Sequence, residues 1–221
     1  MTQAKKRVGV LISGRGSNLQ ALIDAQSAPD YPAQIVRVIS NIPDVFGLER
    51  AQKAGLPTAV IPHKNYPDRP SFEAALNAQL KADGVEIVCL AGFMRVLTDG
   101  FVSSWSGRLI NIHPSLLPSF KGLHTHERAI AEGVRFSGCT VHFVVPEMDS
   151  GPIIVQSAVP VLQEDTPDKL ASRVLEQEHL IYPLALALVA TERARIVDGA
   201  VHLDGVTFAN QPLTNPLPRG A

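Results

Sequence analysis

The feature that most constrains this fold is a regular alternation of short apolar segments with longer segments of helical spacing. Residues 8–12 (Val-Gly-Val-Leu-Ile) form the first apolar run, and similar runs occur at 35–39, 58–61, 87–91 and 109–112. Apolar residues at helical spacing occupy 19–26, 46–54 and 72–81. Continuous apolar runs are typical of strands buried on both faces, and strands joined through helices form right-handed crossovers. We therefore predict an α/β fold with a mostly parallel, twisted sheet flanked by helices.

The pattern changes toward the C-terminus. Two longer strand-like segments, 138–145 and 153–161, are joined by a turn rich in Pro, Asp and Gly, and we predict that they pair as antiparallel neighbours. A long helix is expected over 168–191, and an Asp-Gly turn within 196–203 predicts a hairpin. The sequence shows no repeat and no low-complexity linker. We therefore predict a single domain over residues 1–203 and a Pro-rich tail over 204–221.

Composition restricts the class of function. Lys plus Arg total 20 and Asp plus Glu total 21, so a net charge of −1 gives the chain no overall attraction for nucleic acid. No apolar run approaches the ~18 residues of a membrane span, and the N-terminus leads directly into the first strand. The two cysteines, Cys89 and Cys139, lie far apart, which favours a reducing compartment. We expect a cytoplasmic enzyme without nucleic-acid or membrane partners.

A glycine-containing loop, residues 13–18 (Ser-Gly-Arg-Gly-Ser-Asn), follows the first strand and opens the first helix. Free backbone N–H groups at a helix N-terminus form a cradle for phosphate. The third glycine of a dinucleotide fingerprint is replaced by Leu19, and no Gly-Lys-Ser/Thr follows. A monophosphate therefore suits this loop better than NAD or ATP. A tight turn in which Ser17 or Asn18 only caps the helix explains the pattern about equally well.

Residues 111–118 (Asn-Ile-His-Pro-Ser-Leu-Leu-Pro) place polar side chains at the carboxyl end of a predicted strand. Asn111 and His113 are two residues apart and so project to the same face. In open parallel sheets that end is where ligands bind, and an amide beside a protonated imidazole stabilises an oxyanion. Asp149 could keep His113 charged or accept a proton, or it could be an ordinary turn residue, and its spacing does not place it beside His113.

The other histidines carry weaker signals. His124 and His126 share a predicted loop with Glu127, but no third ligand follows at a suggestive spacing, so no metal is expected. His142 lies in a predicted strand and is expected to be a hydrogen-bonded residue of the core or of the shell around the site.

Taken together, these motifs resemble the phosphoribosylglycinamide formyltransferases. The matching segments are 16–20, 92–97, 111–118, 120–122, 124–126, 148–152 and 177–179, in family order, within a similarity from residue 8 to about 203. The resemblance implies a Rossmann-like formyltransferase fold. It also implies a purine-biosynthesis enzyme that moves a formyl group from 10-formyltetrahydrofolate, as co-substrate, to the amine of glycinamide ribonucleotide. It implies no metal and sets no oligomeric state.

The resemblance also assigns residue roles by position. The catalytic residues would be Asn111, His113 and Asp149, with Asn111 and His113 stabilising a tetrahedral intermediate. The ribonucleotide would contact Gly16, Ser17, Asn18 and Glu178, although the helix pattern alone places Glu178 on a solvated face. The folate would contact Arg69, Leu90, Phe93, Met94, Arg95, Val96, Leu97, Val102, Asn111, Val145, Pro146, Glu147, Met148 and Asp149. One departure is Ser150, where the family pattern favours Gly or Ala.

Three other classes of protein are alternatives to a phosphoribosylglycinamide formyltransferase. A methionyl-tRNA formyltransferase would carry a further C-terminal RNA-binding domain and a basic surface. A formyltetrahydrofolate hydrolase would carry a further N-terminal domain. A non-catalytic nucleotide-binding module would keep the glycine loop but would have no reason to bring Asn111, His113 and Asp149 together.

Overall fold

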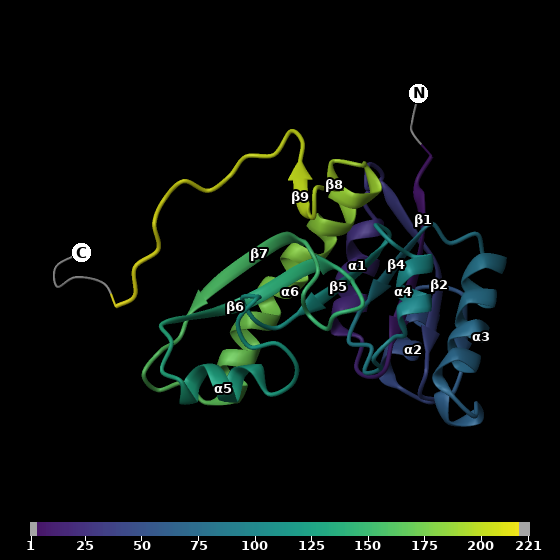
Figure 1. Cartoon of the computed structure of the whole chain (residues 1–221), viewed down its shortest axis with the longest axis horizontal. Helices are drawn as coiled ribbons and strands as arrows, with labels where there is room; N and C mark the ends of the chain where they lie inside the picture. Colours follow the sequence, from purple (N-terminus) through teal and green to yellow (C-terminus); the bar gives the residue numbers. More distant parts are fainter. Residues whose placement is uncertain (1–3, 217–221) are drawn as a thin grey trace.

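Seven strands form one sheet, and their pairing confirms the predicted mostly parallel α/β fold. The computed structural model describes residues 4–216, so residues 1–3 and 217–221, the latter part of the expected tail, lie outside the described residues. The strands are β1 (Lys6–Ile12), β2 (Ala33–Ser40), β3 (Thr58–Val60), β4 (Ile87–Leu90), β5 (Leu109–His113), β6 (Phe136–Phe143) and β7 (Ile153–Pro160). Their order is β3-β2-β1-β4-β5-β6-β7 (Figure 1). Pairing is parallel from β3 through β5, and β6 is antiparallel to both of its neighbours.

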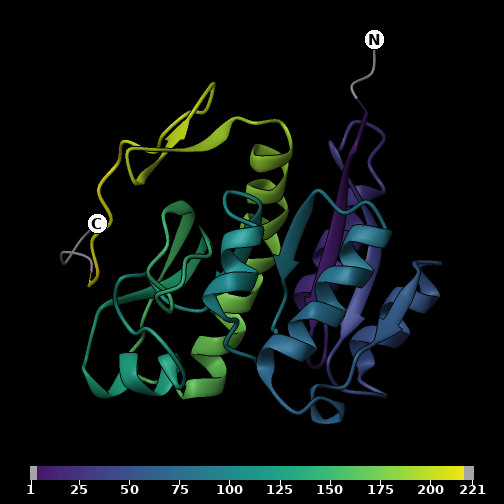
Figure 2. The ribbon, with the colours of Figure 1, turned by 45° about the vertical axis from the view of Figure 1, so that its right-hand side comes forward.

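Helices cover both faces of this sheet. They are α1 (Ser17–Gln26), α2 (Phe46–Lys53), α3 (Arg69–Ala82), α4 (Asp99–Ser104), α5 (Thr125–Ala131) and α6 (Pro167–Ala190), with a 3₁₀ turn η1 (His63–Asn65). Side chains of α1, α2 and α6 share the larger buried core with one face of the strands. Those of α3 and α4 form a second core on the other face. Figure 2 shows α6, in yellow-green, running beside the strands. The strands are therefore buried on both faces, as their continuous apolar runs predict.

Two short helices were not predicted. The seven residues of α5 include His126 and Glu127. The sequence predicts a loop for these two residues, and that prediction is wrong. His124 is the N-cap residue of α5, with a left-handed φ of 57°. Helix α4 has only six residues. Segments of one or two turns are too short to show a hydrophobic period, so the sequence pattern carries little signal for them.

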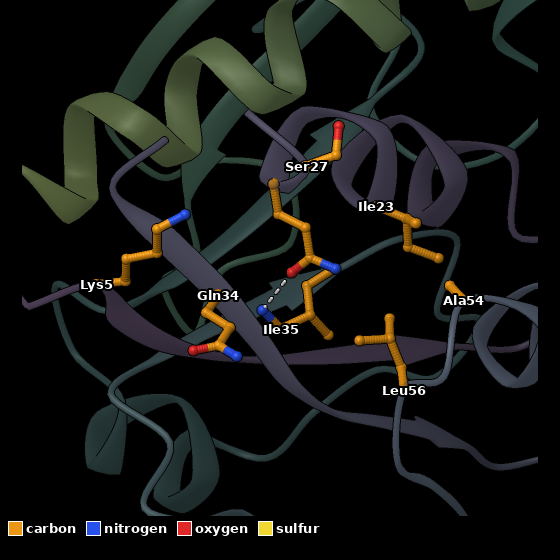
Figure 3. A pocket seen from close by; sticks show the side chains of 8 residues that line it. Lys5, Ile23, Ser27, Gln34, Ile35, Ala54 and Leu56 are labelled. Carbon is orange, nitrogen blue, oxygen red and sulfur yellow. Dashed lines mark hydrogen bonds between the residues drawn. The ribbon is translucent and has the colours of Figure 1, made fainter. Parts of the chain in front are cut away.

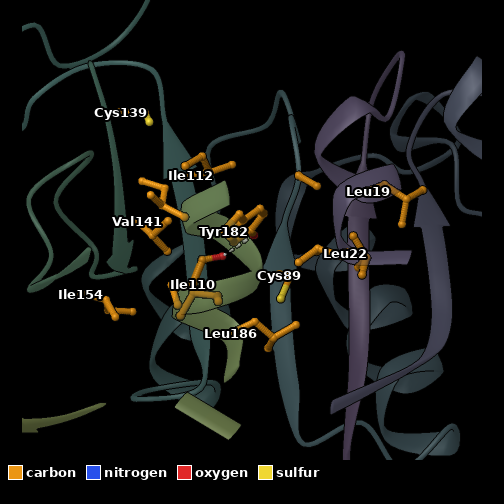
Figure 4. Close-up of a cluster of buried hydrophobic side chains, with 14 of the residues drawn as sticks. Leu19, Leu22, Cys89, Ile110, Ile112, Cys139, Val141, Ile154, Tyr182 and Leu186 are labelled. Atoms are coloured by element: carbon orange, nitrogen blue, oxygen red, sulfur yellow. Dashed lines mark hydrogen bonds between the residues drawn. The ribbon is translucent and has the colours of Figure 1, made fainter. Parts of the chain in front are cut away.

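Helix α6 is anchored to the centre of the sheet by Tyr182. This side chain is fully buried, and its hydroxyl donates a hydrogen bond to the carbonyl oxygen of Leu90 at 2.9 Å. Figure 4 shows Tyr182 reaching from α6 into the core between Ile110 and Cys89. Glu178 lies four residues earlier and therefore on the same side of the helix. The docking of α6 thus carries a carboxylate into the interior of the protein.

The predicted C-terminal hairpin is present as β8 (Ala194–Val197) and β9 (Ala200–Leu203). Its turn residues Asp198 and Gly199 both have positive φ, 50° and 81°, the conformation that favours an Asp-Gly pair. Residues 204–216 contain no helix or strand. The side chain of Asn215 nonetheless donates a hydrogen bond to the carbonyl oxygen of Arg135 at 2.7 Å. Within residues 4–216, no helix has both the length and the apolar character needed to cross a bilayer.

Candidate active site

The loops after β1 and β4 meet where the strand order changes direction. Strand β1 lies between β2 and β4, so the crossovers on either side of it leave in opposite directions. The Ser13 N–H donates to the carbonyl oxygen of Gly92 at 3.2 Å, and the Met94 N–H donates to the Ser13 hydroxyl at 2.8 Å. Ligands of open α/β sheets bind at this switch point, beyond the carboxyl ends of the strands.

The glycine loop is packed closely against α2. Gly16 is the N-cap residue of α1, has a φ of 69°, and receives no side-chain cap. The alternative in which Ser17 or Asn18 caps this helix is therefore wrong. A Cβ atom at Gly16 would lie 2.7 Å from the Cα atom of Gly47, so only glycine fits here. The Arg50 guanidinium donates a hydrogen bond to the carbonyl oxygen of Arg15 at 3.0 Å. The N–H groups that open α1 then remain available to an anion.

Asn18 and Glu178 form a buried polar pair beside this loop. The Asn18 amide donates to the Glu178 carboxylate at 2.7 Å, and Glu178 is only 6% exposed. Burial raises the pKa of Glu178, and the Asn18 hydrogen bond partly offsets this rise. Within the described residues, the Asn18 Oδ1 atom is buried and accepts no hydrogen bond. Buried polar atoms normally find partners, so this acceptor is suited to a donor from a ligand. The solvated position that the helix pattern alone gives Glu178 is wrong.

A cavity of about 490 Å³ runs along α1, beside residues of α2 and α6. It is lined by polar groups together with a small apolar wall: Ser17, Gln20, Ala21, Asp24, Ala25, Arg50, His179, Leu180 and Pro183. Ser17 is the one residue of the glycine loop in this lining, and Arg50 lies in the same lining.

Asn111 is oriented by His142 on the neighbouring strand. The two residues are opposite each other in the β5–β6 pair, and the Asn111 Nδ2 atom lies 3.3 Å from the His142 Nε2 atom. The His142 Nδ1 atom lies 2.9 Å from the carbonyl oxygen of Phe143. Burial lowers the pKa of His142, so its ring is neutral, with the proton on Nδ1 facing that carbonyl. Nε2 is then an acceptor, and Asn111 presents its NH₂ group to it. The prediction of a hydrogen-bonded His142 is confirmed.

His113 lies between two oxygen acceptors. Its Nε2 atom is 3.0 Å from the carbonyl oxygen of Phe120, and its Nδ1 atom is 3.5 Å from a carboxylate oxygen of Asp149. The side chains of His113 and Asp149 are only 8% and 12% exposed. Both ring nitrogens of His113 therefore face oxygen atoms that can accept a hydrogen bond. The 3.5 Å separation is longer than a good N–H···O hydrogen bond, which leaves Nδ1 able to donate elsewhere.

Asp149 lies in a strained turn beside His113. Asp149 has a left-handed φ of 50°, and its carboxylate accepts a hydrogen bond from the Gly122 N–H at 2.8 Å. A Cβ atom at Gly151 would lie 1.7 Å from the carbonyl oxygen of Phe143, so the chain passes here only because Gly151 has no side chain. Asp149 is thus both a turn residue and a neighbour of His113. The structure brings Asn111, His113 and Asp149 to one edge of the sheet.

The residues expected to contact folate divide into a buried and an exposed group. The buried group belongs to the core beneath α3 and α4 and contains Leu90, Phe93, Leu97 and Val102. Met94 and Val96 are exposed, at 68% and 56%, and Arg95 is half-buried. Arg69 is exposed at the first residue of α3, and the segment 145–148 lies at the surface. A ligand can therefore contact mainly the exposed side chains of the loop after β4 and of the loop between β6 and β7.

Sequence reasoning missed a polar network that supports the loop after His113. The Thr140 hydroxyl donates to the carbonyl oxygen of Ser115 at 2.7 Å and accepts from the Leu117 N–H at 3.1 Å. Gln156 on β7 donates to the same hydroxyl at 2.9 Å. The alternation of side chains along β6 could have indicated this network, because it puts Thr140 on the same face as His142. Thr140 is also the residue opposite His113 in the β5–β6 pair.

The described residues contain no group of three or more His, Cys, Asp or Glu side chains arranged to hold a metal ion. His124 Nδ1 instead lies 3.4 Å from Glu127 on an exposed part of α5.

A second cavity, of about 470 Å³, lies near the amino ends of β1 and β2 (Figure 3). It is lined by residues just before β1, in or just after the last turns of α1, in the first part of β2 and just after α2: Lys5, Ile23, Gln26, Ser27, Gln34, Ile35, Ala54 and Leu56. Gln26 accepts a hydrogen bond from the Ile35 N–H at 2.8 Å. None of the residues that the sequence predicts to act in catalysis or ligand binding lines this cavity.

Known proteins are similar to this chain in sequence and in fold. The model of the formyl transferase family matches residues 6–186. A phosphoribosylglycinamide formyltransferase of Haemophilus influenzae is 44% identical over 95% of this chain and 99% of its own length. The human trifunctional purine biosynthetic protein adenosine-3 is 55% identical over 85% of this chain, which spans only 18% of that protein.

A solved structure is similar along almost its whole length. The glycinamide ribonucleotide transformylase 1 of Symbiobacterium toebii superimposes with a TM-score of 0.88 at 46% identity, covering 90% of this chain and 94% of that one. Family model, full-length relative and solved structure agree with one another. The chain therefore belongs to the formyl transferase family.

Proposed function

We propose that this protein is a phosphoribosylglycinamide formyltransferase of purine biosynthesis, which moves the formyl group of 10-formyltetrahydrofolate to the amine of glycinamide ribonucleotide. The observation that carries the proposal is the placement of His113 between a backbone carbonyl and Asp149, with Asn111 on the same strand. The names of the similar bacterial enzymes supply the formyl transfer and its acceptor, glycinamide ribonucleotide, and the resemblance to the family supplies the folate donor.

The ribonucleotide phosphate binds at the start of α1. Gly16, Ser17 and Asn18 supply N–H groups there, and the partial positive charge of the helix end favours an anion. Glu178 and the unpaired Oδ1 atom of Asn18 accept hydrogen bonds from the sugar or the amide of the ribonucleotide. A single phosphate fits this loop because it supplies neither a third glycine nor a P-loop lysine.

The folate binds between the loop after β4 and the loop between β6 and β7. Met94, Val96 and Met148 expose apolar surface on these two loops, and such surface favours a flat ring system. Their backbone groups and Arg95 supply polar contacts, and the folate also lies along Asn111 and Val145, Pro146, Glu147 and Asp149. Leu90, Phe93, Leu97 and Val102 form the wall beneath, and Arg69 pairs with the acidic tail of the folate.

Formyl transfer proceeds by direct attack of the amine on the formyl carbon. The resulting oxyanion accepts hydrogen bonds from the free N–H of Asn111 and from Nδ1–H of protonated His113. One donor of this kind is typically worth ~3–4 kcal/mol of transition-state stabilisation. The His142 contact fixes which end of the Asn111 amide faces the formyl oxygen. The contact with the carbonyl oxygen of Phe120 fixes the orientation of the His113 ring.

Asp149 completes the site. Its carboxylate lies beside Nδ1 of His113, and it accepts the proton that the amine loses, directly or through water. Collapse of the tetrahedral intermediate breaks the bond between the formyl carbon and N10 of the folate, and tetrahydrofolate leaves with N10 protonated. The catalytic groups are then two donors and one base, so the reaction needs neither a covalent enzyme intermediate nor a metal. We assign this chemistry to one formyltransferase domain over residues 1–203, followed by a tail over 204–221, acting in the cytoplasm on two small-molecule substrates.

A direct assay tests this proposal. Purified protein is mixed with a 10-formyl folate, with and without glycinamide ribonucleotide, and release of the deformylated folate is followed by absorbance. We expect release only with the ribonucleotide, and a loss of roughly 10²–10³-fold in kcat for His113→Ala. The control is His202→Ala, on the exposed terminal hairpin. Release without the ribonucleotide would indicate a hydrolase, and near-normal turnover by His113→Ala would refute its role.

A further inference from the structure

One short segment, residues 120–123, contacts both His113 and Asp149, and we call it the clamp segment. The carbonyl oxygen of Phe120 accepts from His113 Nε2 at 3.0 Å. Two residues later the Gly122 N–H donates to the Asp149 carboxylate at 2.8 Å. The relative position of the two side chains therefore depends on where this segment lies. Lys121 sits between the two contacts, and nothing in the proposed mechanism assigns it a role.

The Lys121 ammonium reaches across to the loop that carries Asp149. Its Nζ atom donates to the Ser150 hydroxyl and lies 3.4 Å from a Glu147 carboxylate oxygen. The Ser150 hydroxyl in turn donates to the carbonyl oxygen of Met148 at 3.0 Å. These contacts are on both sides of Asp149 along the chain. A single cation thus joins the clamp segment to the turn that presents the carboxylate.

The clamp segment is also held by helix α5. Arg128 on α5 donates to the carbonyl oxygen of Lys121 at 2.7 Å, and its guanidinium lies 5.3 Å from the centre of the Phe120 ring. The backbone of Lys121 is therefore held against α5 while its side chain holds the opposite loop. This arrangement explains how Asp149 keeps its left-handed φ of 50° beside His113.

We propose that Lys121 is a positioning residue for formyl transfer, which ties the Asp149 turn to the clamp segment through Ser150 and so sets the spacing between Asp149 and His113. The inference rests on the proposed function, because it assumes that these two side chains act in the reaction. A displacement of about 1 Å at a reacting group can lower a rate ~10²-fold, so a contact that never touches substrate can still govern turnover.

Two substitutions break the contact from opposite sides. Lys121→Met keeps a stem of similar length without the ammonium, and Ser150→Ala removes its partner. We expect kcat at saturating concentrations of both substrates to fall roughly tenfold in each, with the KM for the ribonucleotide unchanged. Lys121→Arg restores kcat, and the double variant is no slower than the slower single variant, because both changes remove one interaction. Lys81→Ala, on the exposed end of α3, is the matched control.

A spectroscopic measurement separates this inference from the proposed function. In ¹⁵N-histidine-labelled protein, the ring signals of His113, assigned with His113→Ala, shift in both single variants while the melting temperature stays within a few degrees. Unchanged kcat, losses that multiply in the double variant, or unmoved His113 signals would each overturn the role of Lys121. A wild-type protein that forms no formylated ribonucleotide would remove the proposed function alone, since the His113 signals test the contact without turnover. If Lys121→Met does not fold, Ser150→Ala decides the outcome.

Discussion

The Nδ2 atom of Asn111 lies 3.3 Å from the Nε2 atom of His142, across the antiparallel β5–β6 pair. This contact uses one N–H of the amide and leaves the other pointing away from His142. The neutral state of His142 matters for the contact, because an imidazolium would present a donor to a donor. Burial, the cause of the lowered pKa of His142, thereby also determines which end of the Asn111 amide faces this ring.

Replacing His142 by Phe removes this acceptor but keeps a planar ring. We expect the Asn111 amide to lose its fixed orientation and kcat to fall roughly tenfold or more, with a smaller change in the KM for the ribonucleotide. Steady-state kinetics with each substrate varied in turn measures both constants. A His142→Phe variant with a wild-type kcat would show that Asn111 needs no such support.

Glu178→Gln should stabilise the protein while weakening substrate binding. Burial raises the pKa of Glu178, so this carboxylate favours folding only below its unfolded pKa of ~4.3 and disfavours folding as the pH rises through its raised folded value. The amide keeps the Asn18 hydrogen bond without the buried charge. We expect melting about 2–4 °C higher at pH 8, no difference near pH 4, and a KM for the ribonucleotide raised roughly tenfold. A lower melting temperature at pH 8 would contradict this reading.

Arg50→Ala should affect the ribonucleotide more than the folate. The guanidinium holds the Arg15 carbonyl of the glycine loop at 3.0 Å, and its loss frees the loop whose N–H groups we propose to bind phosphate. We expect the KM for the ribonucleotide to rise several-fold, by roughly the ~1 kcal/mol of one hydrogen bond, with kcat kept. Arg108→Ala, which removes the same charge near the start of β5, is the control. Equal effects of both variants would point to charge alone.

Gly151→Ala should be strongly destabilising. The new methyl group would lie 1.7 Å from the carbonyl oxygen of Phe143, and relief requires movement of the strand end or of the Asp149 turn. We expect a loss of about 1–3 kcal/mol in the free energy of unfolding, measured by urea denaturation, together with reduced turnover. Gly14→Ala is the comparison, because a Cβ atom there meets nothing within 4 Å. Similar stability of the two variants would contradict the close approach at Gly151.

The parallel part of the fold was predictable because buried strands such as β1 and β4 read as continuous apolar runs. The pairing of His113 with Asp149 was not, since it depends on the return of β6, a left-handed turn and the close approach at Gly151. The burial of Glu178 could have been inferred from Tyr182 one turn later. The role of Lys121 has no local signal, because its partners Glu147 and Ser150 come from a distant loop.

The most direct test of the account follows the formyl carbon itself. Folate carrying a ¹³C-labelled formyl group is incubated with the wild-type protein and glycinamide ribonucleotide, and the products are identified by ¹³C NMR. Direct attack at the Asn111, His113 and Asp149 site predicts that the label appears in a formamide on the ribonucleotide amine, and that Asn111→Ala and His113→Ala slow its appearance. Label recovered as free formate would mean that water is the acceptor, and would contradict the proposed transfer.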